Sequence, residues 1–519
     1  MADPRYGNLG YFNREAAAVH RDRTAIVDLS RMPAREIAHG ELDARMDRVA
    51  AALCARGLAP GDRVLLAMAN RSEFVEAFFG AMRAGLVPVP LNVRLGADTV
   101  RFVVEDAGCK AAIVSPGAHA EIEAICAAAG LAPRIATAPA PAGWEAYESV
   151  LAEAEGRGFA PPPIAPRQVA FLPYTSGSTG RPKGVLLSHD GMLWGIRSSQ
   201  RHWPAAPDDR ALIAGPLYHK NAMRVSVKPK LHAGASVVIL PRFEPRDFLL
   251  ALSAYRCTEA GGVPAMYRMM LAERELIESL DFSALAVLEM GSAVVGAELI
   301  AAVERAFGAT VIEAYGLTEG GGPLREAADG RPAPRGSCGR AAPEVGIRLV
   351  DESGAAGEEG ELWVRSPAVL VGYNNRPDLD AARIRDGWLR TGDLFRRDAG
   401  GFFYFQGRTD DQFSCGGENI NPKEVELLLV QHPAVIDAAV APVPHALKDL
   451  APAALVTLRP GRDADEAALK AFALERGPAY AHPRRIFAVD ALPVGGTGKI
   501  DRRAVRERLL ALIAGNRAP

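Results

Sequence analysis

The first third of the chain alternates helical and extended hydrophobic patterns, and this alternation restricts the fold more than any other feature. Residues 41–59 carry apolar side chains at the spacing of one helix face, and residues 62–68 form a short apolar run typical of a buried strand. The same two patterns recur in residues 72–84 and 87–91. Strands that are apolar on both sides need helices on both sides, so the alternation predicts an α/β fold with parallel sheets.

The pattern changes in the second half of the chain. After Gly346 short strands alternate with turns, which indicates a β-barrel-like subdomain, and from Pro422 helices and strands mix again. The chain has 519 residues, and chains longer than about 250–300 residues usually divide into domains with separate hydrophobic cores. We therefore predict a large N-terminal domain of mixed and parallel sheets with helices plus the β-barrel-like subdomain, residues 1–409, and a small α+β domain, residues 410–519.

The charge balance and the cysteine spacing argue against several classes of protein. Lys and Arg number 60 and Asp and Glu number 62, so the domain-wide basic excess of a nucleic-acid binder is missing. The six cysteines lie far apart, without the close pairs of a zinc site or the framework of a disulfide-rich domain. The sequence shows no signal-peptide pattern and no run of about 18 apolar residues, so we expect a cytoplasmic protein without nucleic-acid or membrane partners.

Residues 174–189, YTSGSTGRPKGVLLSH, carry the strongest functional signal. Glycines let backbone N–H groups approach a ligand, hydroxyl groups add hydrogen-bond donors, and a lysine adds a positive charge. A polyphosphate requires such groups. The predicted phosphate-binding residues are Thr175, Ser176, Gly177, Ser178, Thr179, Gly180 and Lys183.

Two other interpretations compete for this stretch. Judged by composition alone, a run rich in Gly, Ser and Thr is most often a flexible turn. The phosphate loop of nucleoside triphosphatases has Gly-Lys-Ser/Thr at the start of a helix, whereas here Pro182 precedes Lys183 and Gly184 begins an apolar strand. The second interpretation is excluded, and the first stays open on composition alone.

The stretch resembles the phosphate-binding signature of the adenylate-forming enzymes, which include acyl-CoA synthetases, luciferases and the adenylation domains of peptide synthetases. Further segments match motifs of that family in the same order along nearly the whole chain. They are EAYGLTE at 313–319, WLRTGDL at 388–394, GRTDDQFSCGGENINPKEVE at 407–426 and LPVGGTGKIDRR at 492–503. The resemblance implies ATP, Mg²⁺ and coenzyme A as cofactors and co-substrates.

The resemblance implies nucleotide contacts in the segment around residue 315. Tyr315 and Gly316 would lie against adenine, Thr318 would donate to a phosphate oxygen, and Glu319 would hold Mg²⁺. A carboxylate suits this ion, which prefers oxygen ligands and often bridges to phosphates. Outside this context, a Thr-Glu pair is more often a helix cap.

The resemblance also implies roles for residues near the C-terminus. Asp393 would accept hydrogen bonds from both ribose hydroxyls, with Arg408 beside it on the nucleotide. Lys499 would contact the substrate carboxylate and the α-phosphate, because a cation stabilises the negative charge that gathers when the two are joined. A lysine on a glycine-rich loop is otherwise usually a solvated side chain.

Members of this family run two half-reactions in one site, with a domain movement between them. The resemblance implies a mobile small domain with its hinge at Asp410, and places Gly416 and Gly417 at the tunnel for the pantetheine arm of CoA. Glycine suits a narrow tunnel because it has no Cβ. Cys415 beside them is interpreted as a structural thiol, since CoA brings the nucleophilic sulfur.

The acyl pocket is predicted by position within the family. His219 lies in PLYH, which resembles an element between the acyl and thiol channels, although a core histidine bonded to a neighbour is a competing interpretation. The predicted lining is Trp194, His219, Lys220, Asn221, Gly261, Gly291, Tyr315, Gly316, Gly320, Gly321 and Gly322.

Basic residues follow His219 where apolar residues are usual, namely Lys220, Arg224, Lys228 and Lys230. Lysine side chains more often point outward. If one points inward, the acid carries a hydroxyl or a second carboxylate, because a buried unpaired lysine is costly. We favour a small or medium carboxylic acid, with or without a hydroxyl group, over a long fatty acid.

The sequence therefore predicts an acid–thiol ligase that makes acyl-CoA, AMP and pyrophosphate, as a monomer or homodimer. An enzyme that loads a carrier protein or only forms the adenylate is a rival, although no carrier domain follows Lys499. Oxidation of the adenylate, as in luciferases, shares every motif. A catalytically silent nucleotide-binding homologue is disfavoured by six intact residues: Lys183, Thr318, Glu319, Asp393, Arg408 and Lys499.

Overall fold

The chain forms two compact units, which we call the larger and the smaller unit. The computed structural model describes residues 3–115, 120–175, 181–291, 297–325, 333–415, 418–445, 449–479, 481–495 and 499–515. The larger unit comprises residues 1–347 and 364–390, and the smaller unit comprises residues 348–363 and 391–519. The predicted hinge at Asp410 concerns movement and stays a prediction.

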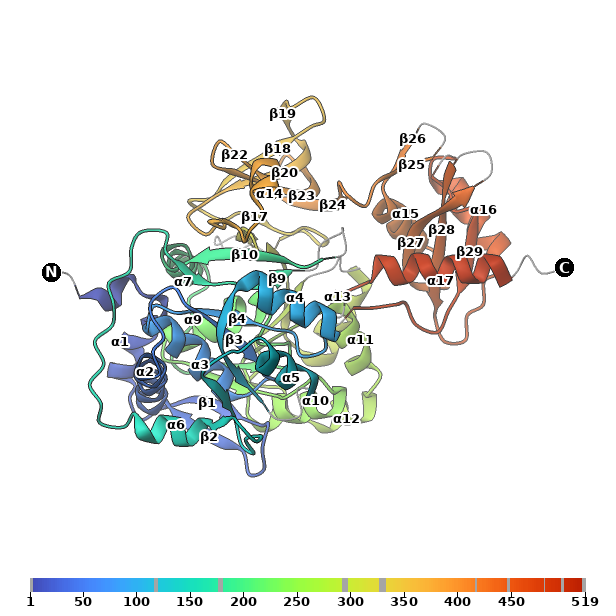
Figure 1. Cartoon of the computed structure of the whole chain (residues 1–519). Coiled ribbons are helices and arrows are strands. Elements are labelled where there is room, and N and C mark those ends of the chain that lie inside the picture. The colour runs from blue at the N-terminus through green and yellow to red at the C-terminus, as the bar shows by residue number, and fades with distance from the viewer. Residues whose placement is uncertain are drawn as a thin grey trace. The chain divides into compact units, whose positions relative to one another are not determined.

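A parallel sheet of five strands lies in the N-terminal part of the larger unit (Figure 1). Its strand order is β4 (Val87–Pro90), β3 (Arg63–Ala67), β5 (Cys109–Val114), β6 (Arg134–Ala136) and β7 (Glu145–Ala146). The helices of this region are α2 (His39–Ala55), α3 (Ser72–Arg83), α4 (Ala97–Ala107), α5 (Ala120–Ala128) and α6 (Tyr147–Glu153). Helix α2, strand β3, helix α3 and strand β4 agree with the four elements that the hydrophobic pattern predicts.

The second large sheet of the larger unit has nine strands. Its order is β17 (Arg340–Ala341), β16 (Gly321–Arg325), β15 (Thr310–Leu317), β14 (Val287–Gly291), β13 (Glu259–Gly262), β11 (Arg210–Ile213), β12 (Ser236–Ile239), β1 (Thr24–Asp28) and β2 (Arg35–Ala38). Neighbours from β15 to β1 pair in parallel, and both ends of the sheet are antiparallel. An apolar core joins these strands to α10 (Pro245–Ala254), α11 (Pro264–Leu271), α12 (Arg274–Ser279) and α13 (Ala297–Phe307).

A small antiparallel sheet carries the predicted phosphate loop. Strand β10 (Lys183–Ser188) pairs with β8 (Val169–Phe171), β9 (Tyr174–Thr175) and β21 (Gly372–Tyr373). Helix α7 (His189–His202) follows directly. The remaining elements of the larger unit are η1 (Pro4–Gly7), η2 (Leu9–Tyr11), α1 (Arg14–Val19), α8 (Lys220–Ala222), η3 (Met223–Val227), α9 (Lys228–His232), α14 (Pro377–Arg383) and β22 (Ile384–Arg385).

The smaller unit contains a three-stranded sheet with helices on both faces. Strand β27 (Val435–His445) is antiparallel to β28 (Asp449–Leu458), which is parallel to β29 (Arg485–Ala488). Because side chains alternate along a strand, Ala438 and Val440 pack with α15 (Pro422–Val430) and α16 (Glu466–Arg476), whereas Ala439 and Ala441 pack with α17 (Arg502–Gly515). This small α+β domain and the α/β larger unit confirm the predicted fold class.

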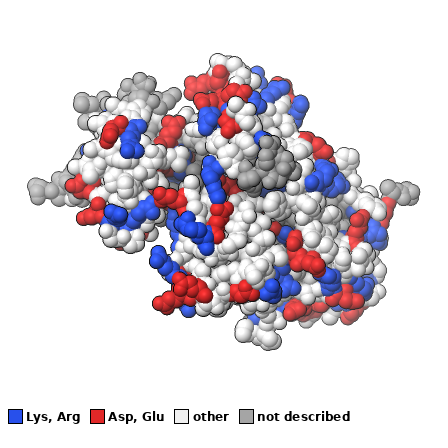
Figure 2. Space-filling view, turned by 180° about the vertical axis from the view of Figure 1, so that it is seen from behind, with Lys and Arg blue, Asp and Glu red and all other residues white. Residues whose placement is uncertain are grey.

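Short strands form the rest of the smaller unit. Strands β18 (Gly346–Val350), β20 (Glu359–Arg365) and β23 (Trp388–Arg397) continue from one unit into the other. The others are β19 (Ala356–Gly357), β24 (Phe403–Arg408), β25 (Phe413–Cys415) and β26 (Glu418–Ile420). On the face shown in Figure 2 basic and acidic side chains are interspersed. Among the described residues, no helix has the length and apolar character needed to cross a membrane.

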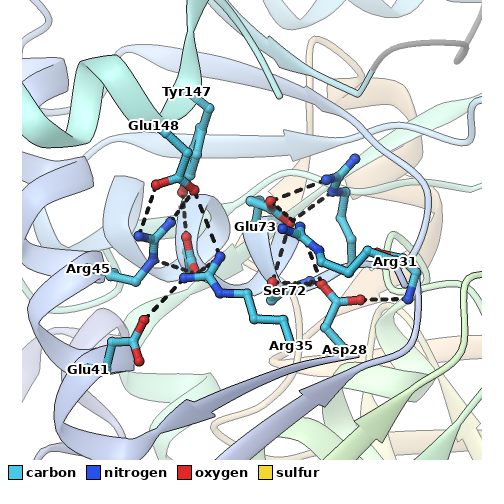
Figure 3. A network of polar contacts seen from close by, with 12 residues as sticks. Asp28, Arg31, Arg35, Glu41, Arg45, Ser72, Glu73, Tyr147 and Glu148 are labelled. Carbon is cyan, nitrogen blue, oxygen red and sulfur yellow. Dashed lines mark hydrogen bonds and ion pairs between the residues drawn. The ribbon is translucent and has the colours of Figure 1, made fainter. Parts of the chain in front are cut away.

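A buried polar network ties together elements of the N-terminal part of the larger unit (Figure 3). Arg45 of α2 donates from Nε to Glu76 of α3 at 2.8 Å and from Nη2 to Glu148 of α6 at 2.6 Å. The hydroxyl of Tyr147 donates to the other oxygen of Glu76 at 3.1 Å. On β1, Asp28 accepts hydrogen bonds from the backbone N–H and the hydroxyl of Ser72. Side chains from four elements are thus fixed to one another by complementary charges.

Candidate active site

The predicted phosphate loop connects two strands that pair with each other. Thr175 of β9 lies opposite Lys183 of β10 in an antiparallel register. The loop residues Ser176, Gly177, Ser178, Thr179 and Gly180 lie outside the described residues. A loop closed by two paired strands differs from the strand-to-helix loop of nucleoside triphosphatases, in agreement with the sequence analysis.

Thr318 and Glu319 lie in the turn that follows β15, and several contacts fix this turn. The Nζ of Lys220 donates to the backbone oxygen of Thr318 at 2.5 Å. The backbone N–H of Leu370 donates to the backbone oxygen of Glu319 at 2.7 Å, and the hydroxyl of Tyr373 lies 3.5 Å from Oε1 of Glu319. Burial and the charge of Glu319 raise the pKa of Tyr373 above its usual value, so this phenol stays protonated as a donor.

The carboxylate of Glu319 fits a Mg²⁺ ligand that works together with substrate phosphates. Among the described residues, no group of three or more His, Cys, Asp and Glu side chains could hold a metal ion. Mg²⁺ is usually bound by one or two carboxylates, water and phosphate oxygens, so it needs no such group. The single half-buried carboxylate of Glu319 meets that requirement.

Each of the three positions after Glu319 favours glycine for a different structural reason. Gly321 has φ of +77°, a left-handed conformation that favours glycine. A Cβ on Gly322 would lie 2.5 Å from Nη1 of Arg224, and a Cβ on Gly320 would lie 3.1 Å from side chains of Leu317 and Leu389. Gly322 therefore gives the guanidinium group of Arg224 room beside β16.

Asp393, Arg408 and Asp410 form one group of ion pairs in the smaller unit. Asp393 of β23 lies opposite Arg408 of β24, and Nη1 of Arg408 donates to Oδ1 of Asp393 at 2.9 Å. The Nε of Arg408 donates to Oδ1 of Asp410 at 2.7 Å. Burial acts to lower the pKa of Arg408, but Asp410 and Asp393 raise it above its usual value. The two predicted nucleotide ligands and the predicted hinge residue are thus in direct contact.

Glu361 supports the turn before Asp393 and is not among the residues predicted from the sequence. Its Oε1 accepts the backbone N–H of Gly392 at 3.0 Å, and Gly392 has φ of +75°. Glu361 lies in the GELWV strand, but nothing in that segment points to a contact with residue 392. Such a contact depends on how two distant strands are brought together.

Lys499 lies on a short loop of the smaller unit, and its side chain is exposed. Val494 and Ile500 form an isolated β-bridge on either side of it, and the backbone N–H of Gly495 donates to the backbone oxygen of Lys499 at 2.7 Å. The predicted CoA-binding residues Gly416 and Gly417 lie outside the described residues. Cys415 beside them is buried, as expected of a structural thiol.

A cavity of about 30 Å³ in the larger unit collects part of the predicted acyl pocket. Trp194, Lys220, Gly320, Gly321 and Gly322 all line it. The other predicted pocket residues do not line this cavity; they are His219, Asn221, Gly261, Gly291, Tyr315 and Gly316.

His219 and two of the predicted pocket glycines lie at or near the ends of secondary-structure elements. The Nδ1 of His219 accepts the backbone N–H of Asn221 at 3.3 Å and so caps the start of α8. Gly291 is the last residue of β14, and Gly261 lies near the end of β13. The ends of parallel strands are where ligands bind in such sheets, which fits the predicted pocket. The pocket assignment itself stays a prediction.

The same cavity contains three cations that were not in the predicted lining. Arg224, Lys228 and Arg325 line it together with Lys220. Lys220, Arg224 and Lys228 are spaced four residues apart on one helical segment, so they share one face. This spacing was visible in the sequence, but the inward direction of the face was not. Arg325 ends β16, two strand repeats after Gly321, so alternation along a strand places both on one face.

The helical segment is irregular where Arg224 lies. Residues Met223–Val227 form a π-helical turn between α8 and α9, and the backbone N–H of Lys228 donates to the backbone oxygen of Met223. Turns of this kind interrupt a helix and occur frequently at functional sites. The turn sets how the three basic side chains are spaced along the cavity.

Burial and the neighbouring charges shift the pKa values of several groups in and near the cavity. Burial, and then the charge of Arg224, lower the pKa of Lys228 to about 7. Burial and the charges of Lys228 and Arg224 lower the pKa of Lys220 well below its usual value. Burial raises the pKa of Glu289 to about 6, against the charge of Arg224, which lies 3.9 Å from it. Perturbed groups in a cavity are typical of binding sites.

Comparison with known proteins identifies the family. Residues 13–374 match the model of the AMP-binding enzyme family, and residues 424–499 match the AMP-binding enzyme C-terminal domain. A feruloyl-CoA synthase of Amycolatopsis sp. is 35% identical over 479 residues, which cover 91% of this chain and 94% of that protein. An indoleacetate–CoA ligase of Aromatoleum aromaticum is 33% identical over 499 residues, or 95% of this chain and 96% of that one.

A solved structure has the same architecture. The crystal structure of ATP-bound MatB from Rhodopseudomonas palustris superimposes with a TM-score of 0.87, covers 98% of this chain and 99% of that one, and is 30% identical in sequence. The match spans nearly the whole length of both chains, and the first family model includes the motif segments at 174–189 and 313–319, whereas WLRTGDL at 388–394 lies between the two family models. The chain therefore belongs to the AMP-binding enzyme family and is an ATP-dependent, AMP-forming acyl-CoA ligase.

Proposed function

We propose that the enzyme ligates a small or medium carboxylic acid to CoA, and that the acid meets ATP at the turn of Thr318 and Glu319. One observation carries this proposal. Lys220 lines the cavity and also donates to the backbone oxygen of Thr318 at 2.5 Å. Gly320 and Gly321 continue directly from that turn into the cavity wall. The cavity wall thus contacts the segment assigned to the phosphates through Lys220 and continues from it along the chain.

In the first half-reaction a carboxylate oxygen of the acid attacks the α-phosphorus of ATP. The bond from that phosphorus to the bridging oxygen breaks, and pyrophosphate leaves with the electron pair. Lys499 contacts the carboxylate and the α-phosphate, because negative charge gathers there in the transition state. Thr318 donates its hydroxyl to a phosphate oxygen, and Thr175, Ser178, Thr179 and Lys183 bind the other phosphates.

The nucleotide is held by groups that complement its parts. Tyr315 and Gly316 lie against adenine, and Asp393 accepts hydrogen bonds from the ribose hydroxyls with Arg408 beside it. The hydrogen bond from Arg408 to Oδ1 of Asp393, at 2.9 Å, holds this carboxylate in place, and a carboxylate has further acceptor sites for the ribose hydroxyls. Glu319 would hold Mg²⁺, which neutralises phosphate charge when it is bound.

In the second half-reaction the sulfur of CoA attacks the acyl carbon, the bond from that carbon to the phosphate oxygen breaks, and AMP leaves. The thiol releases its proton to water, and the product is a thioester. Gly416 and Gly417 accommodate the pantetheine arm, His219 lies between the acyl and thiol channels, and Asp410 is the hinge between the two half-reactions. The two glycines suit this role because they carry no Cβ.

The cellular setting is also part of the proposal. The six cysteines, Cys54, Cys109, Cys126, Cys257, Cys338 and Cys415, are all free thiols, which suits a reducing compartment. We therefore place the enzyme in the cytoplasm, as a monomer or homodimer. Light scattering of the purified enzyme distinguishes these two states.

The test separates the two half-reactions with the variant Lys499→Ala. Adenylate formation, measured as pyrophosphate release with ATP, Mg²⁺ and a panel of acids, should fall by about 10²-fold or more, as for a lost charge-stabilising group. Thioester formation from supplied acyl-AMP and CoA should keep its rate. Lys470→Ala, at a half-buried lysine of α16, serves as the control and should affect neither step.

Three outcomes would contradict parts of the proposal. Equal loss in both half-reactions would refute the role of Lys499. AMP release without a thioester would favour an enzyme that forms only the adenylate or loads a carrier protein. Absence of AMP with every acid would support the silent homologue.

A further inference from the structure

Three basic side chains of one helical segment turn inward toward the cavity. Lys220 and Lys228 keep only 6% and 3% of their surface exposed, although lysine is among the residues least often buried. Arg224 lies between them in the π-helical turn, and Arg325 reaches the same cavity from β16. The cavity wall therefore carries four cationic side chains from two elements.

These cations have few anionic partners. The Nζ of Lys228 contacts only Sδ of Met192, at 4.0 Å, and no oxygen atom among the described residues accepts a hydrogen bond from it. Lys220 donates to a backbone oxygen. Arg224 donates to Oδ1 of Asn221 at 3.1 Å and lies 3.9 Å from the carboxylate of Glu289.

Arg325, like the two lysines, has no carboxylate within 4.0 Å among the described residues. Its Nη1 donates to the hydroxyl of Ser199 at 3.2 Å, and its Nε is buried without a partner among the residues described. Glu289 is thus the one carboxylate within 4.0 Å of any of the four cations in the described part of the chain. The cavity holds an excess of positive charge that the protein itself does not neutralise.

A neighbouring lysine shows that the fold pairs a buried cation when its role is structural. Lys230 lies on the same helical segment and is also 3% exposed. Its Nζ lies 2.7 Å from Glu259 and 3.2 Å from Asp209, so two carboxylates neutralise it. Lys228, two residues earlier, has neither. A buried charge without a partner destabilises the folded protein. Lys228 bears this cost at the cavity, whereas two carboxylates offset it for Lys230.

The size of the cavity fits a small anionic group. A volume of about 30 Å³ holds roughly two water-sized atoms, which matches the two oxygens of a carboxylate. The hydroxyl of Ser366 also lines the cavity and is buried without a hydrogen-bond partner among the residues described. It adds a donor to those of the lysines and arginines.

We propose that this cavity binds a second carboxylate of the acyl substrate, so that the enzyme activates a short dicarboxylic acid at one end and holds its other end with Lys220, Arg224, Lys228 and Arg325. The inference rests on the proposed function, because it assumes that the acid occupies this cavity. Ammonium and guanidinium groups hold carboxylates through short, charge-assisted hydrogen bonds. The second carboxylate would also supply the negative charge that the four cations lack.

The test compares acids that differ only in the second carboxylate. Malonate is paired with propionate, succinate with butyrate, glutarate with pentanoate, and isophthalate with benzoate. The kcat/KM for acyl-CoA formation is measured for each acid at saturating ATP and CoA. At least one diacid should exceed its monoacid by about 10²-fold or more, because a site built for a polar group rejects a substrate that leaves it unpaired.

Two variants then examine the cavity. Lys228→Met replaces the unpaired cation by an apolar side chain, and Gly322→Ala places a Cβ 2.5 Å from Nη1 of Arg224 and must displace it. Each should lower the ratio of diacid to monoacid by about 10-fold or more, as for a lost hydrogen bond to a charged group. The KM for ATP should not change. Lys110→Met, at a lysine that is 62% exposed, is the control and should leave the ratio unchanged.

Other results would overturn the inference while leaving the proposed function intact. The inference fails if monoacids are used as well as their diacid partners, or if Lys228→Met raises the KM for ATP and leaves the acid preference unchanged, since the cations would then bind phosphate. A preference for 3-sulfopropionate over succinate would replace the carboxylate by a sulfonate and refute the class of acid proposed. If no acid releases AMP, the proposed function itself fails.

Discussion

The polar network of Figure 3 and the cationic cavity both bury charge in the larger unit, but they balance it differently. In the network the guanidinium groups of Arg31, Arg35, Arg45 and Arg71 face the carboxylates of Asp28, Glu73, Glu76 and Glu148. Burial acts to raise the pKa of Glu73, but Arg71 and Arg31 lower it to about 2. Charges of both signs are nearly equal in number there.

Four cations line the cavity, and Glu289, 3.9 Å from Arg224, is the one carboxylate within 4.0 Å of any of them among the described residues. The pKa of Lys228 falls to about 7 through burial and then the charge of Arg224, where a paired lysine would keep its charge. A buried network with complementary charges holds elements of the fold together. A buried cluster of one sign destabilises the fold, and it is retained where a ligand brings the opposite charge.

The largest effect should come from removing one charge of the balanced network. Glu76→Gln keeps the shape of the side chain but leaves Arg45, whose side chain is 8% exposed, without its charge partner on α3. We expect a loss of about 3–5 kcal/mol in the free energy of unfolding, as for a broken buried ion pair. Urea unfolding followed by circular dichroism measures it.

Glu41→Gln provides the control for this loss. Its carboxylate pairs with Arg35 at 3.1 Å, but its side chain is 47% exposed. Solvent screens such a pair, so the loss should stay below about 1 kcal/mol. Equal losses for Glu41→Gln and Glu76→Gln would show that burial does not distinguish the network from a surface pair.

Much of the scaffold could be predicted from the sequence, because local patterns determine it. The helical spacing of residues 41–59 and the apolar run 62–68 correspond to α2 (His39–Ala55) and β3 (Arg63–Ala67). The strand that follows Pro182 also formed as expected, as β10. These elements depend on side-chain periodicity within a single segment.

The cavity could not be predicted in the same way. The spacing of Lys220, Arg224 and Lys228 puts them on one helix face, but the sequence does not say whether that face meets solvent or protein. Arg325 and Glu289 come from strands far along the chain, and their electrostatic interactions with Arg224 depend on how the nine-stranded sheet is assembled. Burial of a charge is a property of tertiary structure.

Substitutions of two lysines on the same helical segment should change the free energy of unfolding in opposite directions. Lys228→Met should raise the free energy of unfolding of the ligand-free enzyme by about 1–4 kcal/mol, because an apolar side chain replaces an unpaired buried charge. Lys230→Met should lower it, since Asp209 and Glu259 would lose their partner. Urea unfolding at pH 7 without acid or nucleotide measures both. If the two substitutions change stability in the same direction, the contrast between paired and unpaired lysines is wrong.

The smallest effect expected is the pH dependence of that gain. Lys228 has a pKa of about 7 in the folded enzyme and an ordinary value of 10.5 when unfolded. Between these values the unfolded chain binds more protons at this side chain, so the stability of the parent enzyme rises with pH. Below pH 7 both states are protonated and the full cost is present. The advantage of Lys228→Met should therefore be greatest below pH 7 and shrink from there toward pH 10, by at most about 1.4 kcal/mol per pH unit.

The charged groups near Lys228 also affect the pH dependence of the stability difference between the two proteins. Arg224 lies beside Lys228 as a second cation, while Lys220 has a lowered pKa of its own and titrates in both proteins. The difference between the two proteins then reports Lys228 together with its coupling to Lys220. The same series with the preferred diacid at saturation should give a flat difference around pH 7, because a bound carboxylate favours the protonated lysine. A difference that does not vary with pH in the ligand-free enzyme would mean that Lys228 keeps its proton throughout, and that the cavity holds a neutralising partner beyond Glu289.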